Sequence, residues 1–545
     1  MASIQPLHQV LGHRLAKHLL RRTTYRYSKQ DIDDFAAKTV QAAVNQLFLT
    51  TTDPIPEPQD PEDTVPFWID NISPSNSISG DYRKRSYVRA AWLYNALSTL
   101  SIRHKMTQFL YNQFTINITN VSSTWFYDYL NILDFYAWGS FKDLTLKVTY
   151  SNAMLRYLDN HLNRKNRPNE NYARELLELF TIGKGPQIGP GNYTHYTEAD
   201  IVQAAKVLTG IRTENTRTNI DATTGIPVGQ VQFNYHDTSN KTFSSAFQNT
   251  VITGASTAQD VEGEVIAFLD MIFNQVATAK NICRRLYRFF VHDTITPEIE
   301  RDIITPLSNT LIQNNYVLEP VVKQLLQSEH FYDKDDLDAS NEIIGGIIKP
   351  PSQLLTEVIA LFDIDLPDPV ADPLTFYKVF NHNFLVTRFF PAAGMPFFEP
   401  STVAGYPAYY QGPLYSKYWF DSSTIISRYK LLDSFLSGRN ETGGSRSQIG
   451  LQLNLVDFFV NSPIFTDRNN PATVVADAVA YFFPESLDAA RLSYFTNDIF
   501  LGGLMPYNWS NEWYNYQQTN DDSVIAPRLE TLFTFLLNSP EFQTY

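Results

Sequence analysis

One predicted helix carries the side chains whose types and spacing favour acid–base chemistry. Pro168 near its start and Gly183 at its end bracket a helix of about four turns. Its polar face places Glu170, Arg174 and Glu178 at four-residue spacing, so that one guanidinium can bridge two carboxylates. On the surface, such a ladder contributes about 0.2 to 0.5 kcal/mol per pair. If the ladder is buried, desolvation can raise the pKa of one glutamate toward the range of a general acid. The spacing is compatible with both situations.

A hydrolase that used these glutamates would need another carboxylate nearby. Carboxylates at positions i and i+8, such as those of Glu170 and Glu178, lie about 12 Å apart along a helix axis. The paired carboxylates of glycosidases lie roughly 5 to 9.5 Å apart. Glu198, Asp200 or Asp237 would therefore have to complete the pair. The alternative function that this helix suggests is a hydrolase acting on a carbohydrate or cell-envelope polymer through a Glu/Arg cluster.

Histidine and cysteine residues give weaker indications of a catalytic or metal site. His236 and Asp237 are neighbours, and successive side chains of a strand point to opposite faces, so the two do not form a catalytic dyad. We keep both as candidate binding residues. The chain contains no histidine pattern of a metal motif. Cys283 is the only cysteine, which excludes an intramolecular disulfide and a site with several cysteine ligands. We predict no metal site and no cofactor.

Aromatic residues make up 14% of the chain, which is high for an ordinary domain. Most of them are expected in the core. Two clusters, 406–415 and 509–516, contain many turn formers and little periodicity, and we predict ordered aromatic loops there. Tyrosine and tryptophan are enriched at interfaces. The candidate binding residues in these clusters are Tyr406, Tyr409, Tyr410, Tyr415 and Trp509.

Composition excludes several classes of protein. The 545 residues carry a formal net charge of −14, and 43% of them are hydrophobic. An acidic chain without basic clusters is unsuited to binding nucleic acid or an anionic membrane surface. No uncharged apolar run approaches the roughly 18 residues needed to cross a bilayer. The first residues lack the pattern of a signal peptide. We expect a soluble protein that is cytoplasmic, or exported with a partner that carries a signal.

Helical periodicity dominates the sequence. The predicted helices cover about 30–48, 83–114, 125–138, 141–162, 169–182, 198–209, 262–273, 277–291, 297–313, 318–327, 341–362, 422–436, 449–460, 471–481 and 523–537. Strand signals concentrate in 215–251, where 226–235 alternates. The predicted fold class is mostly α, a large multi-helix assembly with one small β-hairpin excursion around 215–251 and long loops rich in aromatic residues and proline.

Proline and glycine mark the expected boundaries. Residues 1–53 form N-terminal helices, and 54–66, with five prolines, form a stiff connector. The main helical domain covers 67–437. A flexible hinge at 438–447 precedes a C-terminal helical segment, 448–545, which can pack with the rest as one domain.

The segment from Asn169 to Gly183 also carries a family resemblance. It reads Asn-Glu-Asn-Tyr-Ala-Arg-Glu-Leu-Leu-Glu-Leu-Phe-Thr-Ile-Gly, and Tyr-Thr-Glu-Ala-Asp-Ile follows at 196–201. With 18–23, 233–237 and 285–291, these segments resemble the bacterial family called domain of unknown function 1800, over nearly the whole chain. The resemblance implies an α-rich fold and no established activity. It also implies a neighbouring gene for a protein of a second family, domain of unknown function 1501, which is similar to alkaline phosphatases and sulfatases.

The chain departs from the family pattern at several positions. Where the family usually shows Phe-Trp-His-Asn-His-Phe, residues 109–114 read Phe-Leu-Tyr-Asn-Gln-Phe, so both histidines are missing. Residues 349–351 read Lys-Pro-Pro instead of Lys-Ser-Pro. Residues 400–406 read Pro-Ser-Thr-Val-Ala-Gly-Tyr instead of Pro-Pro-Asn-Val-x-Gly-Trp. Tyrosine and glutamine cannot replace imidazole near neutral pH, so a histidine-based site of the family would be lost here.

These observations leave open whether the protein is an enzyme. The leading hypothesis is a non-catalytic helical scaffold or accessory protein that binds a partner. The candidate partner is the protein similar to alkaline phosphatases, and the aromatic clusters are the expected contact surface.

Overall fold

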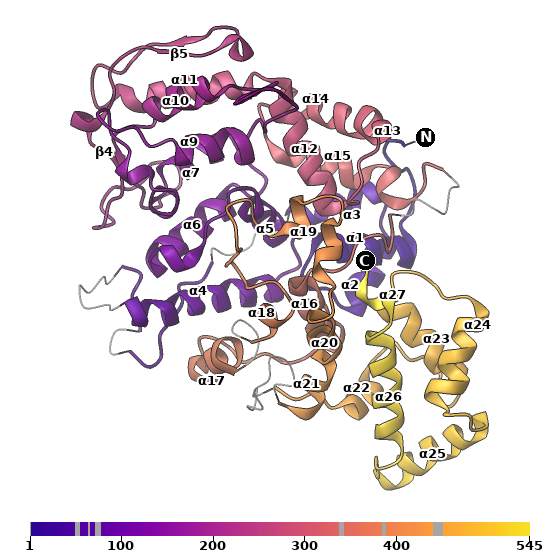
Figure 1. Cartoon of the computed structure of the whole chain (residues 1–545). Helices are drawn as coiled ribbons and strands as arrows, with labels where there is room; N and C mark the ends of the chain where they lie inside the picture. The colour runs from indigo at the N-terminus through magenta and orange to yellow at the C-terminus, as the bar shows by residue number, and fades with distance from the viewer. Residues whose placement is uncertain are drawn as a thin grey trace.

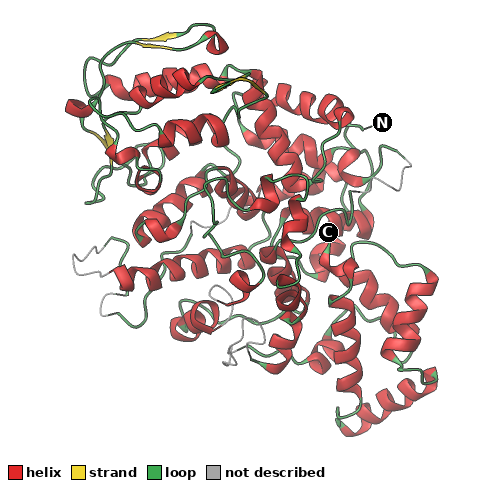
Figure 2. Ribbon diagram, viewed as in Figure 1, coloured by secondary structure: helices red, strands yellow, loops and turns green. Residues whose placement is uncertain are grey.

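The computed structural model describes residues 2–49, 55–63, 66–70, 78–336, 343–383, 388–439 and 451–545. Most of these residues lie in helices, joined by loops and three small sheets (Figures 1 and 2). The mostly α fold class that the sequence predicts is confirmed. Residues 54, 64 and 65 of the predicted connector, and 440–447 of the predicted hinge, lie outside the described residues.

The first part of the chain contains α1 to α10; short 3-10 or π-helical segments are labelled η. The elements are α1 (Gly12–Thr23), α2 (Lys29–Ala36), α3 (Val40–Leu49), α4 (Ile78–Ser98), α5 (Arg103–Gln113), η1 (Ile118–Asn120), α6 (Ser123–Phe135), α7 (Phe141–Tyr150), α8 (Asn152–Tyr157), η2 (Asn160–Leu162), α9 (Asn171–Glu175), η3 (Leu176–Phe180) and α10 (Glu198–Val207).

The rest of the chain contains α11 to α27. These elements are η4 (Phe233–Tyr235), η5 (Ser245–Phe247), α11 (Asp260–Phe273), α12 (Val276–Phe290), α13 (Pro297–Ile299), η6 (Glu300–Ile304), α14 (Thr305–Gln313), α15 (Leu318–Gln327), η7 (His330–Tyr332), α16 (Pro351–Leu361), α17 (Pro373–Tyr377), η8 (Lys378–Asn383), α18 (Phe390–Ala392), α19 (Pro407–Tyr410), η10 (Tyr415–Trp419), α20 (Thr424–Tyr429), α21 (Leu431–Ser437), α22 (Leu455–Asn461), α23 (Pro471–Phe482), α24 (Ala489–Ser493), η11 (Tyr494–Phe500), α25 (Pro506–Thr519), α26 (Ile525–Leu537) and α27 (Pro540–Gln543).

Three antiparallel two-stranded sheets complete the described part. They pair β1 (Gln187–Gly189) with β2 (Asn192–Tyr193), β3 (Ile211–Arg212) with β4 (Gln230–Val231), and β5 (Lys241–Thr242) with β6 (Val251–Ile252). The predicted excursion at 215–251 therefore contains β4, β5 and the start of β6. The β1–β2 hairpin and β3 precede it.

Tertiary contacts divide several helices that the periodicity predicts as continuous. The predicted helix 30–48 is two helices, α2 and α3. Between them, Lys38 accepts a backbone hydrogen bond from Leu11, and Val40 donates one to Gln9. This pairing with the N-terminal segment uses the backbone groups that a continuous helix would need. The hydrophobic pattern is the same in both cases, so it does not reveal the break.

The sequence prediction is wrong for the aromatic segment 509–516, which lies in α25 and not in a loop. Pro506 occupies the first turn, where its missing N–H is tolerated. Trp509, Trp513 and Tyr516 then follow at helical spacing and stack on one another, with ring centroids 6.3 and 5.3 Å apart. The interior edge of α25 is therefore an aromatic stripe.

The helices α22 to α27, which we call the C-terminal arm, group together in yellow tones at the lower right of Figure 1, with α25 at the outer end. The arm is tied to α1. Lys17 donates to the carbonyl of Phe483 at 2.8 Å and Arg21 to that of Phe482 at 2.7 Å. These carbonyls belong to the C-terminal end of α23, where the helix dipole favours cations.

Candidate functional site

The carboxylate–arginine ladder predicted for one helix forms only in part. Arg174 contacts Glu170 at 3.2 Å, and it makes two hydrogen bonds of 2.8 Å to Glu198 of α10. Glu178 instead forms an ion pair with Lys184 at 2.5 Å. The helix changes to π-helical geometry at Leu176–Phe180, and the wider turn rotates Glu178 away from Arg174. The predicted bridge between Arg174 and Glu178 is therefore wrong.

The electrostatics of this helix single out a glutamate that the sequence analysis did not consider. The Glu175 carboxyl is half-buried, and burial together with the charge of Glu178 raises its pKa to about 7. Hydrogen bonds from Arg174 lower the pKa of Glu198. Glu170 and Glu198 keep more than two fifths of their side chains exposed, at 42% and 44%. The ladder itself is thus a surface feature, and Glu175 is its perturbed neighbour.

His236 and Asp237 have separate partners. His236 is buried and pairs with Glu264 at 3.0 Å, while its other ring nitrogen lies 2.8 Å from the carbonyl oxygen of Thr209. Asp237 points elsewhere and accepts hydrogen bonds from the backbone and hydroxyl of Ser239. Neither residue lines a pocket described below. The structure gives His236 a place in the interior of the β excursion.

Two of the candidate aromatic residues are core residues. Trp509 has 0% exposure and donates its indole N–H to the carbonyl of Arg468. Tyr406 has 4% exposure and donates its hydroxyl to the carbonyl of Pro396. The sequence predicts both residues on a contact surface, but they lie in the core. Their polar atoms find backbone partners, which is how Trp and Tyr are tolerated inside a protein.

Tyr409, Tyr410 and Tyr415 lie nearer the surface. The Tyr415 ring lies under the guanidinium of Arg288, 5.0 Å from its centroid. Tyr409 packs its ring against Phe289 of α12, and its hydroxyl is buried. The segment 406–415 therefore covers α12 instead of forming a free loop.

A different set of large apolar and aromatic side chains is exposed on the arm. Met505, Tyr507 and Tyr514 are 62%, 63% and 59% exposed, and Leu504 beside them is 46% exposed. Tyr507 and Tyr514 are seven residues apart on α25 and share its outer face. We call Leu504, Met505, Tyr507 and Tyr514 the arm face.

At the centre of the molecule, a buried cluster of charges joins α1 to α16. The carboxylate of Glu357 contacts Arg21 at 2.8 Å, Lys349 at 2.7 Å and the hydroxyl of Tyr27 at 2.6 Å. Burial lowers the pKa of Lys349 to about 7 against the attraction of Glu357. Burial would raise the pKa of Glu357, but the charges of Lys349 and Arg21 hold it below its usual value. Glu357 is therefore ionised at neutral pH.

Further buried cations surround this cluster and bind neutral partners. Lys105 donates to the side-chain oxygen of Gln353 and lies over the Tyr25 ring, 4.2 Å from its centroid. Arg428 donates to Gln543 at 2.8 Å. Burial lowers the pKa of Lys105 to about 7 and that of Arg428 to about 9. The interior is electropositive as a result.

Several segments that match or depart from the family pattern lie next to this buried charge cluster. Gln113, where the resemblance expects histidine, donates to the carbonyls of Phe180 at 2.8 Å and Leu179 at 3.2 Å in the π-helical segment. Gly405 lies against Asn112, and a Cβ there would lie 3.2 Å from the hydroxyl oxygen of Thr115. Between these segments and α12 lies a small cavity, lined by Phe109, Asn112, Gln113, Arg285, Phe289, Ala404, Tyr409 and Tyr410.

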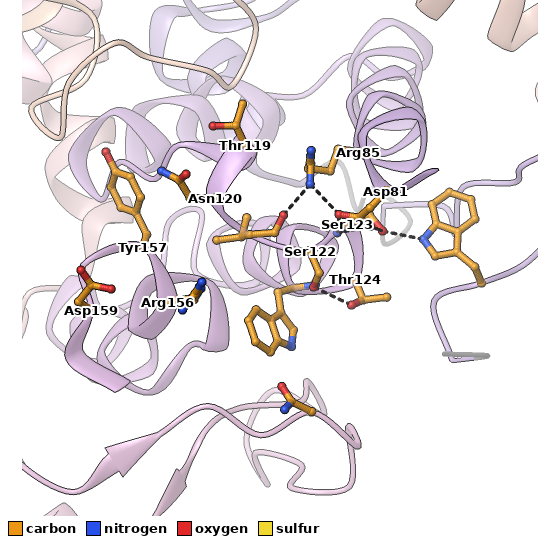
Figure 3. Close-up of a pocket in the computed structure, with 14 residues that line it drawn as sticks. Asp81, Arg85, Thr119, Asn120, Ser122, Ser123, Thr124, Arg156, Tyr157 and Asp159 are labelled. Atoms are coloured by element: carbon orange, nitrogen blue, oxygen red, sulfur yellow. Dashed lines mark hydrogen bonds and ion pairs between the residues drawn. The ribbon is translucent and has the colours of Figure 1, made fainter. Parts of the chain in front are cut away.

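A larger hollow lies elsewhere, near the start of α4 and α6 (Figure 3). Its volume is about 780 Å³. Asp81 forms an ion pair with Arg85 at 2.6 Å and accepts a hydrogen bond from the hydroxyl of Ser123, also at 2.6 Å. Figure 3 shows Tyr157 and Asp159 on the opposite side. The Asp81 and Arg85 charges are already paired with one another.

Two features are absent from the described residues. We find no group of three or more His, Cys, Asp or Glu side chains there that is placed to hold a metal ion. In the same part of the chain, no helix combines the length and apolar character that crossing a membrane requires.

Comparison with known proteins gives one match. A family model described as "Protein of unknown function (DUF1800)" matches residues 18–544. Neither a curated protein nor a solved structure matches the chain.

Proposed function

The chain belongs to the DUF1800 family of proteins of unknown function, and we propose that it is a non-catalytic helical accessory protein that binds a partner protein. The observation that carries this proposal is the arm face. Met505, the N-cap of α25, and Tyr507 and Tyr514, about two turns apart on that helix, expose about three fifths of their surface each, at 62%, 63% and 59%. Exposed large apolar side chains that gather in one place mark interaction sites.

The chemistry of the arm face indicates what the partner must offer. Tyrosine and methionine contribute large contact area, and tyrosine hydroxyls can hydrogen-bond at the rim. Asp521 and Asp522 are exposed just beyond α25, so a negative charge borders the face. The partner surface should therefore be an apolar groove with basic residues at its edge.

The family resemblance suggests which protein this is. We propose the protein similar to alkaline phosphatases and sulfatases, of the second family of unknown function, 1501, as the partner. The chain would then act in the cytoplasm, or be exported together with that partner when it carries a signal.

The test mixes the purified chain with this partner and records the complex by native mass spectrometry and its Kd by calorimetry. The variant Tyr507→Ser with Tyr514→Ser should weaken binding about tenfold or more, because two anchoring rings are lost. The matched control is Ile188→Ser with Val370→Ser, since these residues are 70% and 77% exposed but lie elsewhere. Equal binding by both double variants, or no complex with the unaltered chain, would contradict the proposal.

A second function, the hydrolase, is supported by one observation. The half-buried carboxyl of Glu175 has a pKa raised to about 7 by burial and by Glu178. A carboxyl that titrates near neutral pH can act as a general acid or base. In this proposal Glu175 takes the acid–base role, with Glu170, Arg174 and Glu178 as its neighbours on the same helix, and the substrate is a carbohydrate or cell-envelope polymer.

A further inference from the structure

We infer that the hollow lined by Arg164, Arg167 and Arg212 binds a tetrahedral oxyanion with two negative charges, such as a phosphate or sulfate group. The hollow lies between the loop that precedes α9 and the end of β3, and its volume is about 490 Å³. The other residues that line it are Leu162, Pro168, Asn169 and Glu170. No residue of the arm face is among them, so the inference goes beyond the proposed partner binding and does not depend on it.

Hydrogen bonds hold the loop that carries two of the arginines. Arg167 donates its backbone N–H to the carbonyl of Arg164 at 2.8 Å, which closes a turn. The buried side chain of Asn163 donates to the carbonyl of Ala205 at 2.8 Å and accepts the backbone N–H of Asn169 at 2.9 Å. The loop is therefore ordered without using the side chains of Arg164 and Arg167.

Arg212 reaches the same hollow from β3. Its guanidinium lies over the ring of Tyr235, 4.5 Å from the centroid, and its Nη1 donates to the carbonyl of His161. The Nε atom is buried and has no hydrogen-bond partner in the described part of the chain. Its Nη2 also lacks a partner among the described residues. Stacking and one hydrogen bond thus fix the guanidinium, while part of its donor set stays unused.

The three positive charges lack matching counter-charges. Arg164 and Arg167 are exposed, and their side chains have no ion pair with any residue that the structure describes. The one carboxylate in the lining, that of Glu170, already contacts Arg174 at 3.2 Å. Three arginines against one glutamate give the lining a net charge of +2, although the whole chain carries −14. Like charges that face one hollow repel one another, and a bound anion would remove that repulsion.

The electrostatics of Arg212 agree with this geometry. Burial lowers the pKa of Arg212, and the charge of Arg164 lowers it further. An arginine nevertheless stays protonated in a protein. The two guanidinium groups therefore remain charged and close enough to influence one another.

The chemistry of the lining defines the ligand. A guanidinium presents a planar set of N–H donors that matches the oxygens of a phosphate or sulfate. The net charge of +2 favours an anion with two charges over a simple carboxylate. The volume lies within the roughly 300 to 1,000 Å³ of small-molecule sites. Leu162, which is 55% exposed, offers apolar surface in the same hollow. The anionic group can therefore belong to a small phosphorylated or sulfated molecule.

The test uses the full chain with inorganic phosphate, sulfate and acetate at pH 7.5 and matched ionic strength. Phosphate and sulfate should raise Tm to a limit and bind in calorimetry, whereas acetate, with one charge, should bind about tenfold more weakly. Glucose 6-phosphate distinguishes the sources of the group. Tighter binding than that of inorganic phosphate indicates a phosphorylated molecule, and weaker binding indicates free phosphate.

Arg164→Gln removes a side chain that has no partner in the described structure. Without ligand its Tm should stay the same or rise, because one of three like charges is removed. Phosphate should bind about tenfold more weakly or worse. The matched control is Arg26→Gln, at an exposed arginine between α1 and α2, which should bind phosphate like the unaltered chain.

Arg212→Lys separates a built site from a diffuse positive surface. It keeps the charge but loses the planar set of donors, so a built site should again bind phosphate about tenfold more weakly. The inference is overturned if neither phosphate nor sulfate binds the unaltered chain, or if acetate binds as tightly as they do. It is also overturned if Arg164→Gln binds phosphate as well as Arg26→Gln, or if Arg212→Lys binds it as well as the unaltered chain.

Discussion

The carboxylate of Glu357 lies 2.7 Å from the ammonium nitrogen of Lys349, and neither side chain is exposed to solvent. Arg21 contacts the same carboxylate at 2.8 Å. One buried negative charge therefore faces two buried cations from different parts of the chain. Charge is weakly screened in a protein interior, so each cation depends on that carboxylate.

Glu357→Gln should strongly destabilise the fold. The substitution keeps the shape of the side chain but leaves Arg21 and Lys349 without a counter-charge, and breaking a buried pair in this way costs about 3 to 5 kcal/mol. The measurement is the free energy of unfolding from urea denaturation at pH 7. The matched control is Glu319→Gln, which removes a surface pair with Lys323 and should cost about 0.5 kcal/mol or less. Equal losses in both variants would show that the buried charge is not needed.

Buried lysines should make the protein more stable as pH rises from 7 toward 10. Burial lowers the pKa values of Lys17, Lys105 and Lys349 to about 7, from 10.5 in the unfolded chain. Between these pH values the unfolded chain binds more protons than the folded one, so the free energy of unfolding increases with pH. Each such lysine contributes a slope of up to about 1.4 kcal/mol per pH unit.

Lys105→Met tests this slope directly. It removes one of the three lysines, so the increase in unfolding free energy between pH 7.5 and 9.5 should become smaller. Lys165→Met, at an exposed position, should leave the slope unchanged. A slope that is flat in the unaltered chain, or identical in all three proteins, would contradict the lowered pKa values.

The sequence predicts the α-helical class and most helices because apolar residues at helical spacing depend only on local pattern. It does not reveal which polar residues are buried. Lys105 and Lys349 look like ordinary solvent-facing positions, and only the packing of distant helices around them shows otherwise. The family resemblance was the available sequence signal for this buried region. Its segments 109–114, 285–291, 349–351 and 400–406 lie around the interior charge cluster and the nearby cavity.

Local geometry explains the other differences. The π-helical turn at Leu176–Phe180 cannot be derived from four-residue spacing, and it separates Glu178 from Arg174. Trp509, Trp513 and Tyr516 do have helical spacing, but the many polar residues between them hid the buried edge of α25. In both cases, neighbouring elements supplied the contacts that decided the conformation.

Substitutions on the two faces of α25 should differ strongly in their effect on stability. Trp509→Ala removes a fully buried ring and its hydrogen bond to Arg468, which should cost about 3 to 5 kcal/mol. Tyr514→Ala, at a side chain that is 59% exposed, should change the free energy of unfolding by about 0.5 kcal/mol or less. Chemical denaturation of both variants checks this. A large loss for Tyr514→Ala would mean that its ring supports the fold and is not a free contact surface.

The raised pKa of Glu175 makes a prediction that does not depend on knowing a substrate. Its pKa is about 7 in the folded chain, against 4.5 for the free carboxyl. Between these values the folded chain binds the additional proton, so the contribution of Glu175 to stability is present below pH 4.5 and is lost as pH rises through 7. Glu175→Gln removes this loss, and the variant should therefore gain stability relative to the unaltered chain between pH 5 and pH 8.

Urea unfolding at pH 5 and pH 8 measures that gain, with Glu170→Gln as the control on the same helix, where Arg174 pairs with the carboxylate. If the hydrolase proposal is also correct, release of sugars from a cell-envelope polymer should show a pH limb near 7 that disappears in Glu175→Gln. A gain in stability without any hydrolysis would leave Glu175 as a strained structural carboxyl and favour the accessory role. No gain at pH 8 would show that its pKa is not raised, and would remove the observation on which the hydrolase proposal rests.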